Sequence, residues 1–161
     1  ERPLSRLASF SEELRQRGYV PSSQWITRES SPASAPEREA LGLARGARVA
    51  RLERLRLADG VPMAYERSVV LLTALPKPQA LEGSLYWHLA RSGQAPVRAV
   101  QHIRAVNAEP AMAAQLQIAA GDALLWVTRT AYLEDGAAVE YTQSYCRSDY
   151  YDFVAEMRKT P

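Results

Sequence analysis

The sequence predicts an α+β fold in which one mainly antiparallel β-sheet is flanked by short helices and built from two pseudo-repeated halves. Asp-Gly pairs at residues 59–60 and 135–136 each lie between alternating runs, a pattern typical of β-hairpins. Leu41–Gly46 resembles Leu116–Gly121, and each segment leads through a predicted strand to one of these turns. This weak repeat, with a period of about 75 residues, predicts two helix-plus-hairpin halves that share one sheet, with a cleft between them.

Composition is that of an ordinary soluble domain. At 161 residues, with 47% apolar and 24% charged residues, the chain is long enough for one domain with a substantial core. No apolar run approaches the roughly 20 residues of a membrane helix, and no signal-peptide core is present. The single Cys146 cannot form an internal disulfide, so we expect a cytoplasmic protein. A net charge of +2, with basic and acidic residues interspersed, does not indicate a nucleic-acid surface.

Capping and turn residues mark the elements. Residues 1–8 are expected to be the end of an interdomain linker and residues 9–161 one domain, which opens with a capping box at Ser9–Glu12. The helix that follows should end at Gly18. The further predicted elements are, in order, a strand at 22–31, a helix at 37–43, irregular chain at 71–82, a helix between Ser84 and Gly93, a strand at 96–106, a helix opening at 109–110, the second hairpin at 122–146, and a last strand at 151–157 with Phe153 inward.

The register of the first hairpin decides which side chains share a face. A two-residue loop, Asp59-Gly60, would mix apolar and charged groups on both faces, whereas a three-residue loop, Ala58–Gly60, separates them. We therefore predict the three-residue loop. Its apolar face holds Leu55, Leu57, Val61, Met63 and Tyr65, and its polar face holds Arg54, Arg56, Pro62, Ala64 and Glu66.

The second hairpin is predicted to have the same kind of loop, at Glu134–Gly136. One face then carries polar groups and the other is apolar. The polar face holds Thr130, Glu140, Thr142, Ser144 and Cys146, and the apolar face holds Leu125, Val127, Val139 and Tyr145.

The polar face of the first hairpin has the chemistry of an anion site. Arg54 and Arg56 have only Glu66 as an acid beside them, and an unpaired guanidinium out of water costs several kcal/mol. The face must therefore be wet or must receive an anion, and Arg suits carboxylate or phosphate. Glu66 and Glu140 can accept hydroxyl or amide hydrogens, so we expect an anionic, hydroxyl-rich small molecule.

Simpler interpretations of the same residues stay open on spacing alone. The arginine pair could be a solvated edge with surface ion pairs worth at most about 1 kcal/mol each. Ser11 and Ser84 could be simple helix caps, Glu140 could pair across the strands with Thr130, and Cys146 could be a small buried thiol. The two histidines are isolated, and no metal-ligand spacing, cofactor motif or catalytic motif is present.

Several ordered motifs together resemble a known family. They are SFSEEL at 9–14 with Arg17-Gly18, RLRLADGVPMAYE at 54–66, GSLY at 83–86, Asp135-Gly136 with VEY at 139–141, and SYCRSDYYDF at 144–153. Nearly the whole chain is thus similar to the effector-binding (UTRA) domain of the HutC branch of GntR-type bacterial transcription regulators. The resemblance implies a chorismate-lyase-like fold, a homodimer, and an N-terminal winged helix-turn-helix that binds operator DNA and is absent from this chain.

The resemblance also implies a ligand site. In amino-sugar-responsive relatives, the matching positions line the pocket or meet the sugar; in this chain they are Phe10, Ser11, Arg54, Arg56, Glu66, Ser84, Tyr86 and Glu140. Cys146 stands where those relatives carry Tyr, which implies a wider pocket. We expect a non-enzymatic domain without cofactor or metal that binds a phosphosugar or a carboxylate such as urocanate and allosterically controls operator binding. The alternative is a chorismate-lyase-like enzyme that uses the same Arg/Glu cleft.

Overall fold

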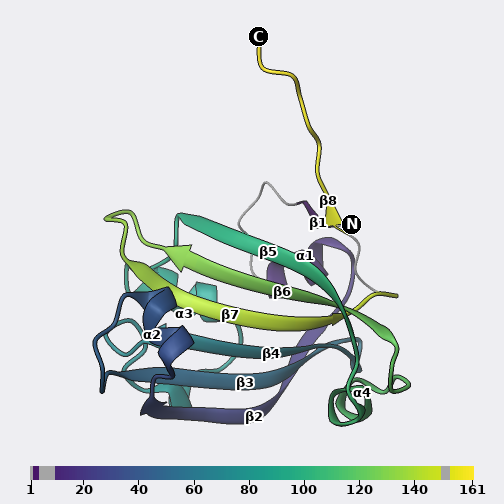
Figure 1. The fold of residues 1–161 in the computed structure, drawn as a ribbon, viewed down its shortest axis with the longest axis horizontal. Coiled ribbons are helices and arrows are strands. Elements are labelled where there is room, and N and C mark those ends of the chain that lie inside the picture. The colour runs from purple at the N-terminus through teal and green to yellow at the C-terminus, as the bar shows by residue number, and fades with distance from the viewer. Residues whose placement is uncertain (1, 4–9, 150–152) are drawn as a thin grey trace.

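One six-stranded antiparallel sheet forms the body of the domain (Figure 1). The structure, a computed structural model, describes residues 2–3, 10–149 and 153–161. The strand order is β2-β3-β4-β7-β6-β5, with β2 (Pro21–Pro32), β3 (Arg48–Ala58), β4 (Val61–Leu71), β5 (Arg98–Asn107), β6 (Ala123–Tyr132) and β7 (Ala138–Arg147). The short strands β1 (Arg2–Pro3) and β8 (Phe153–Val154) form a separate parallel pair. The predicted α+β fold with an antiparallel sheet is confirmed.

Short helices cover both faces of this sheet. They are α1 (Phe10–Gln16), α2 (Ala35–Leu41), α3 (Leu85–Arg91), α4 (Pro110–Leu116) and the 3-10 turn η1 (Pro78–Ala80). In Figure 1, α2 and α4 lie in front of the sheet and α3 lies behind it. The clusters of buried side chains agree, because Leu41 of α2 packs with Val69 whereas Leu89 of α3 packs with Val70, its neighbour on the other face.

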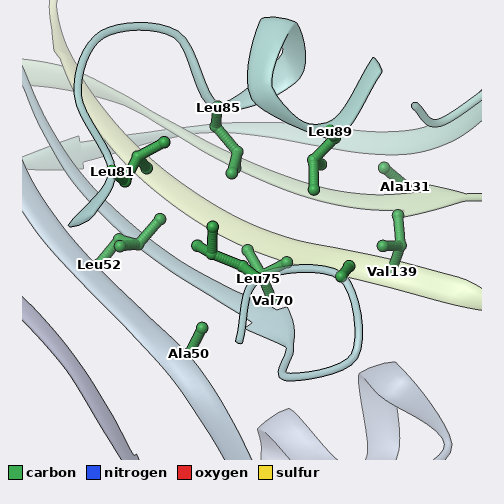
Figure 2. Close-up of a cluster of buried hydrophobic side chains, with 10 residues drawn as sticks. Ala50, Leu52, Val70, Leu75, Leu81, Leu85, Leu89, Ala131 and Val139 are labelled. Carbon is green, nitrogen blue, oxygen red and sulfur yellow. The ribbon is translucent and has the colours of Figure 1, made fainter. Parts of the chain in front are cut away.

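The face behind the sheet is closed by the segment between β4 and β5. Leu75 and Leu81 from the irregular chain, with Leu85 and Leu89 from α3, pack onto Val70 and its neighbours (Figure 2). Each of these leucines is at most 5% exposed. Burying one such side chain contributes roughly 1.5–3 kcal/mol, so this segment is held firmly over the sheet.

The turn of the first hairpin differs from the prediction. Asp59 and Gly60 both have positive φ, 49° and 79°, and Ala58 pairs directly with Val61. The loop therefore has two residues, with the φ values of a type I′ turn, and the predicted three-residue loop is wrong. An Asp-Gly pair favours this turn because its twist matches that of the flanking strands.

A β-bulge restores the predicted sharing of faces farther from the turn. Between the pairs Leu57–Pro62 and Arg56–Ala64, β4 carries one extra residue, Met63. Beyond the bulge Arg54 pairs with Glu66, so the arginines and Glu66 share a face as predicted. The expected places of Met63 and Pro62 are wrong: Met63 packs in one cluster with Ala64, and Pro62 pairs with Leu57.

The predicted register of the second hairpin is wrong by one residue along β6. Thr130 pairs with Tyr141 and Arg129 with Thr142, so Arg129, and not Thr130, lies on the face of Glu140. Leu125 and Val127 pair with Cys146 and Ser144 and lie on that same face; Val139 packs with Leu89 of α3. The connection, residues 133–137, is longer than the predicted loop, and a shift of one residue moves a whole strand to the opposite face.

The remaining elements lie close to their predicted places. The helix expected at 37–43 begins at Ala35, because Ser34 and Glu37 form a capping box, and Gly42 ends it. The last strand is shorter than expected, covering only Phe153–Val154, and residues 150–152 of the prediction lie outside the described residues. Phe153 packs against the cluster that contains Leu14 of α1, as the inward orientation predicts.

Candidate ligand-binding site

The two hairpins meet where β4 pairs with β7, and a small cavity opens on the α3 side of this junction. Arginine and glutamate side chains project into it from β3, β4, β6 and β7, and the first residues of α3 close it from above. We call this the arginine cavity; its lining is Arg54, Arg56, Glu66, Ser84, Leu85, Tyr86, Arg129 and Glu140.

Glu66 holds Arg54 and Arg56 of β3 through one carboxylate oxygen. Arg56 Nη1 donates to Glu66 Oε1 at 3.0 Å, and Arg54 Nε lies 3.4 Å from the same atom. Arg54 also donates from Nη1 to the carbonyl oxygen of Gly83 at 2.8 Å and lies over the ring of Trp25, with Cζ 4.6 Å from the ring centroid. The side chains of Arg54 and Arg56 are only 3% and 4% exposed, so the alternative of a solvated edge is wrong.

Burial and charge oppose each other in this group. Burial alone would raise the pKa of Glu66, but the positive charges of Arg56, Arg54 and Arg129 outweigh it and lower that pKa to about 2. Burial and the neighbouring charge of Arg56 lower the pKa of Arg54 to about 10, against the attraction of Glu66. Both groups are therefore ionised near neutral pH, and the cavity wall carries fixed charges.

A second charged group forms around Glu140. The Tyr86 hydroxyl donates to Glu140 Oε1 at 2.8 Å, and Arg129 Nε lies 3.6 Å from that oxygen. The Arg129 guanidinium also lies over the Tyr86 ring, with Cζ 5.1 Å from the centroid. Burial and the charge of Glu140 raise the pKa of Tyr86 well above its ordinary value, so its hydroxyl stays protonated and continues to donate.

The charges that line the arginine cavity do not balance. Three guanidiniums and two carboxylates belong to the described lining, in a largely buried space, and Glu13, outside this lining, is a further acid that attracts Arg129. Isolated charge in such a place costs several kcal/mol unless a partner or water compensates it. The arrangement therefore favours an anion.

A second cavity adjoins the first and shares Glu66 and Arg129 with it. We call it the cysteine cavity, because Cys146, 1% exposed, forms part of its wall. Its other lining residues are Ala64, Gln101, Val127, Thr142 and Ser144. The two cavities are small, about 20 Å³ for the arginine cavity and about 10 Å³ for the cysteine cavity, and their linings meet at Glu66 and Arg129.

Most residues predicted for the site come together here. Arg54, Arg56, Glu66, Ser84, Tyr86 and Glu140 line the arginine cavity, and Cys146 lines the cysteine cavity. The Ser84 hydroxyl also caps α3, accepting from Trp87 N at 3.3 Å. The side chains of Phe10 and Ser11 lie outside the described residues.

Three participants were not predicted. Trp25 stacks on Arg54, Gln101 lines the cysteine cavity, and Arg129 lines both cavities. The correct register of the second hairpin would have placed Arg129 beside Glu140, since strand alternation alone then decides the face. The pairing of Trp25 with Arg54 across β2 and β3 has no local motif that marks it.

Comparison with known proteins gives the family of this chain. The family model described as the UTRA domain matches residues 16–152. The chain belongs to the UTRA domain family. Its sequence is 32% identical over 160 residues to the HTH-type transcriptional repressor NagR of Bacillus subtilis, covering 98% of this chain and 66% of NagR. It is 33% identical over 159 residues to the probable transcriptional regulator PhnF of Escherichia coli, covering 96% of this chain and 66% of that protein.

Solved UTRA domains share the fold. The crystal structure of the effector domain of PhnF from Mycobacterium smegmatis superposes with a TM-score of 0.90 at 27% identity, covering 98% of this chain and 99% of that one. The GntR-family resemblance is thereby confirmed, since solved GntR-family regulators are among the matches. This UTRA domain spans about two thirds of the length of the curated relatives it matches. Among its described helices, none has the length and apolar character needed to cross a membrane.

Proposed function

We propose that this UTRA domain is the ligand sensor of a cytoplasmic GntR-family regulator of the HutC branch. It binds a small anionic metabolite, a phosphosugar or a carboxylate, in the arginine cavity. The observation that carries the proposal is the excess of buried guanidinium charge, with Arg54 and Arg56 dividing a single oxygen of Glu66. An anion at this place compensates positive charge among the lining residues, and the planar guanidinium suits two parallel bonds to phosphate or carboxylate.

The rest of the effector faces the second charged group. Glu140 and Tyr86 line the arginine cavity together with Arg54 and Arg56 and can exchange hydrogen bonds with hydroxyl groups. The adjoining cysteine cavity adds the hydroxyls of Thr142 and Ser144. A ligand with one anionic end and a hydroxylated body matches this distribution.

The effector acts, in this proposal, on DNA binding by a winged-helix domain that precedes this one in the full-length homodimer. The domain begins its described body with α1, so in this proposal an anion bound in the arginine cavity acts through the N-terminal end of the domain and changes the spacing of the two DNA-reading domains. The names of the relatives, a transcriptional repressor and a transcriptional regulator, support this role. They also support the inference that the domain is not an enzyme, which incubation with chorismate tests directly: no product should form.

A thermal-shift screen tests the proposal. Phosphosugars, urocanate and related acids are added to the wild type, to Arg56→Ala and to the control Arg104→Ala, which removes an exposed arginine from the opposite face of the sheet. A ligand at 100 times its Kd stabilises the folded state by about 2.7 kcal/mol, an easily measured shift. We expect a hit for the wild type and the control and none for Arg56→Ala. A ligand that stabilises Arg56→Ala as much as the wild type would contradict the assignment of anion binding to the arginine cavity.

A further inference from the structure

Arg129 occupies the boundary between the two cavities. It projects from β6 and lines both of them, and its side chain is only 12% exposed. A ligand that extends from the β3 arginines toward Cys146 must therefore pass this guanidinium. In this position the Arg129 guanidinium would contact the middle of a bound effector.

One donor of Arg129 has no acceptor. Its Nε atom is buried and makes no hydrogen bond within the part of the chain that the structure describes, because Glu140 Oε1, at 3.6 Å, is too far away. A buried donor without an acceptor costs about 1–3 kcal/mol. A ligand oxygen within reach of this N–H would recover that free energy.

Arg129 also changes what Glu140 can bind. The carboxylate already accepts from the Tyr86 hydroxyl and pairs electrostatically with Arg129. Attraction to Glu140 and Glu66 outweighs burial and keeps the pKa of Arg129 above its ordinary value, so the cation persists. An ammonium group of a ligand would meet this cation and a carboxylate that is already neutralised, and such like-charge contacts are unfavourable.

We propose that Arg129 selects the effector by donating to an oxygen acceptor in the middle of the ligand and by rejecting an amine at that place. The inference rests on the proposed function and narrows its ligand class. The effector is an anion with a second oxygen function, a hydroxyl, carbonyl or carboxylate, and without an ammonium group beside Glu140.

Two pairs of probes isolate this choice, because the members of each pair differ only in hydroxyl against amine. They are 3-phospho-D-glycerate with O-phospho-D-serine, which have the same configuration, and glucose 6-phosphate with glucosamine 6-phosphate. Their affinities are measured by isothermal titration calorimetry at a pH where the amines are protonated. The wild type should bind the hydroxyl member of at least one pair about tenfold or more tighter than its amine.

Arg129→Gln frees Glu140 and should abolish or invert this preference. The matched control Arg104→Gln removes one positive charge from an exposed site on the other face of the sheet and should keep the preference. Arg129→Lys retains the charge but lacks the Nε–H donor, so it should still reject the amines while binding the hydroxyl ligands more weakly. This variant supplies the test if Arg129→Gln does not fold.

The outcomes separate this inference from the proposed function. Equal binding of hydroxyl and amine members by the wild type, or an unchanged preference in Arg129→Gln, overturns the role of Arg129 and leaves the anion site standing. Failure of the wild type to bind any of the four probes, inorganic phosphate, or urocanate and the related acids of the thermal-shift screen overturns the anion site and this inference with it.

Discussion

Glu66 stabilises two buried guanidiniums with a single carboxylate oxygen. The side chains on both sides are almost fully buried, at 3% and 4% exposed for the arginines and 10% for the acid. In such a place the free energy lost by desolvating the charges is about as large as the free energy gained from their attraction. Removing one partner is nevertheless strongly destabilising, because it leaves the other charge buried and uncompensated. The stability of the domain is therefore sensitive to this residue.

Glu66→Gln should lower the free energy of unfolding by about 3–5 kcal/mol, because it leaves Arg54 and Arg56 buried without a counter-charge. Urea unfolding measures the change. The control is Glu82→Gln, which breaks the exposed pair between Glu82 and Arg28, and should cost no more than about 1 kcal/mol. Equal losses of unfolding free energy in the two variants would contradict the inference that Glu66 compensates the charge of Arg54 and Arg56.

The same residue gives the domain a defined acid sensitivity. The pKa of Glu66 is about 2 in the folded protein, below its ordinary value of 4.5, so its contribution is fully present above pH 4.5 and is lost as the pH falls toward 2. Glu37 and Asp149 also have lowered pKa values, so the wild type alone does not isolate this effect.

Urea midpoints measured across this pH range should therefore show a difference between wild type and Glu66→Gln that shrinks as the pH falls. A difference that is constant from pH 4.5 to pH 2.5 would contradict the lowered pKa.

The two hairpins show what strand patterns predict and where they fail. For the first, the separation of arginines from leucines placed Arg54, Arg56 and Glu66 on one face correctly, even though the turn was wrong, because the bulge at Met63 restores the parity. For the second, the predicted loop is too short, so the prediction does not place Arg129 on the face of Glu140. Bulges and loop lengths depend on strand twist and side-chain packing, which the alternation of apolar and polar residues does not encode.

The segment before α3 is the element on which the arginine cavity depends. Gly83 has a φ of 74° and its carbonyl oxygen accepts from Arg54 Nη1, so its backbone conformation fixes that arginine. Gly93, just beyond α3, has a φ of 71° and does not belong to the described lining of the arginine cavity. A Cβ at either glycine would meet no atom within 4 Å, so the strain of a substitution is purely local.

Gly83→Ala and Gly93→Ala should each destabilise the domain by about 1–2 kcal/mol, since both force a side chain into the left-handed region. Only Gly83→Ala should weaken anion binding, because it moves the carbonyl that holds Arg54. Chemical denaturation measures the unfolding free energy of each variant. Calorimetry with a ligand identified in the thermal-shift screen measures the anion affinity. Similar anion affinity in both variants would contradict the role of the Gly83 carbonyl.

At the scale of the molecule, the continuous sheet brings two halves of the sequence together. The pairing of β4 with β7 joins the hairpins, so Glu66 and Glu140 lie in one lining although they are far apart in the chain. The internal repeat and the family motifs predict one sheet shared by two hairpins, and the six-stranded sheet confirms it. Trp25, which stacks on Arg54, and the lining residues Gln101 and Arg129 belong to no motif and came only from the structure.

In the full-length regulator, the effector should change operator affinity by a factor within the usual allosteric range of about 5–150-fold. Arg56→Ala should bind operator DNA like the wild type in the absence of effector and should not respond to it, because the substitution removes the anion contact and leaves the DNA-reading domain intact. Fluorescence anisotropy with labelled operator measures the operator affinity of each variant with and without effector. A wild type whose operator affinity is unchanged by a bound effector would contradict the allosteric part of the proposal.

The most direct test of the central claim is a crystal structure of this domain with the hit of the thermal-shift screen bound. The account predicts that the phosphate or carboxylate lies in the arginine cavity, within hydrogen-bonding distance of the Arg54 and Arg56 guanidiniums. An anion found elsewhere, for example in the surface groove lined by Gln117, Asp122 and Arg147, with the arginine cavity occupied only by solvent, would contradict it.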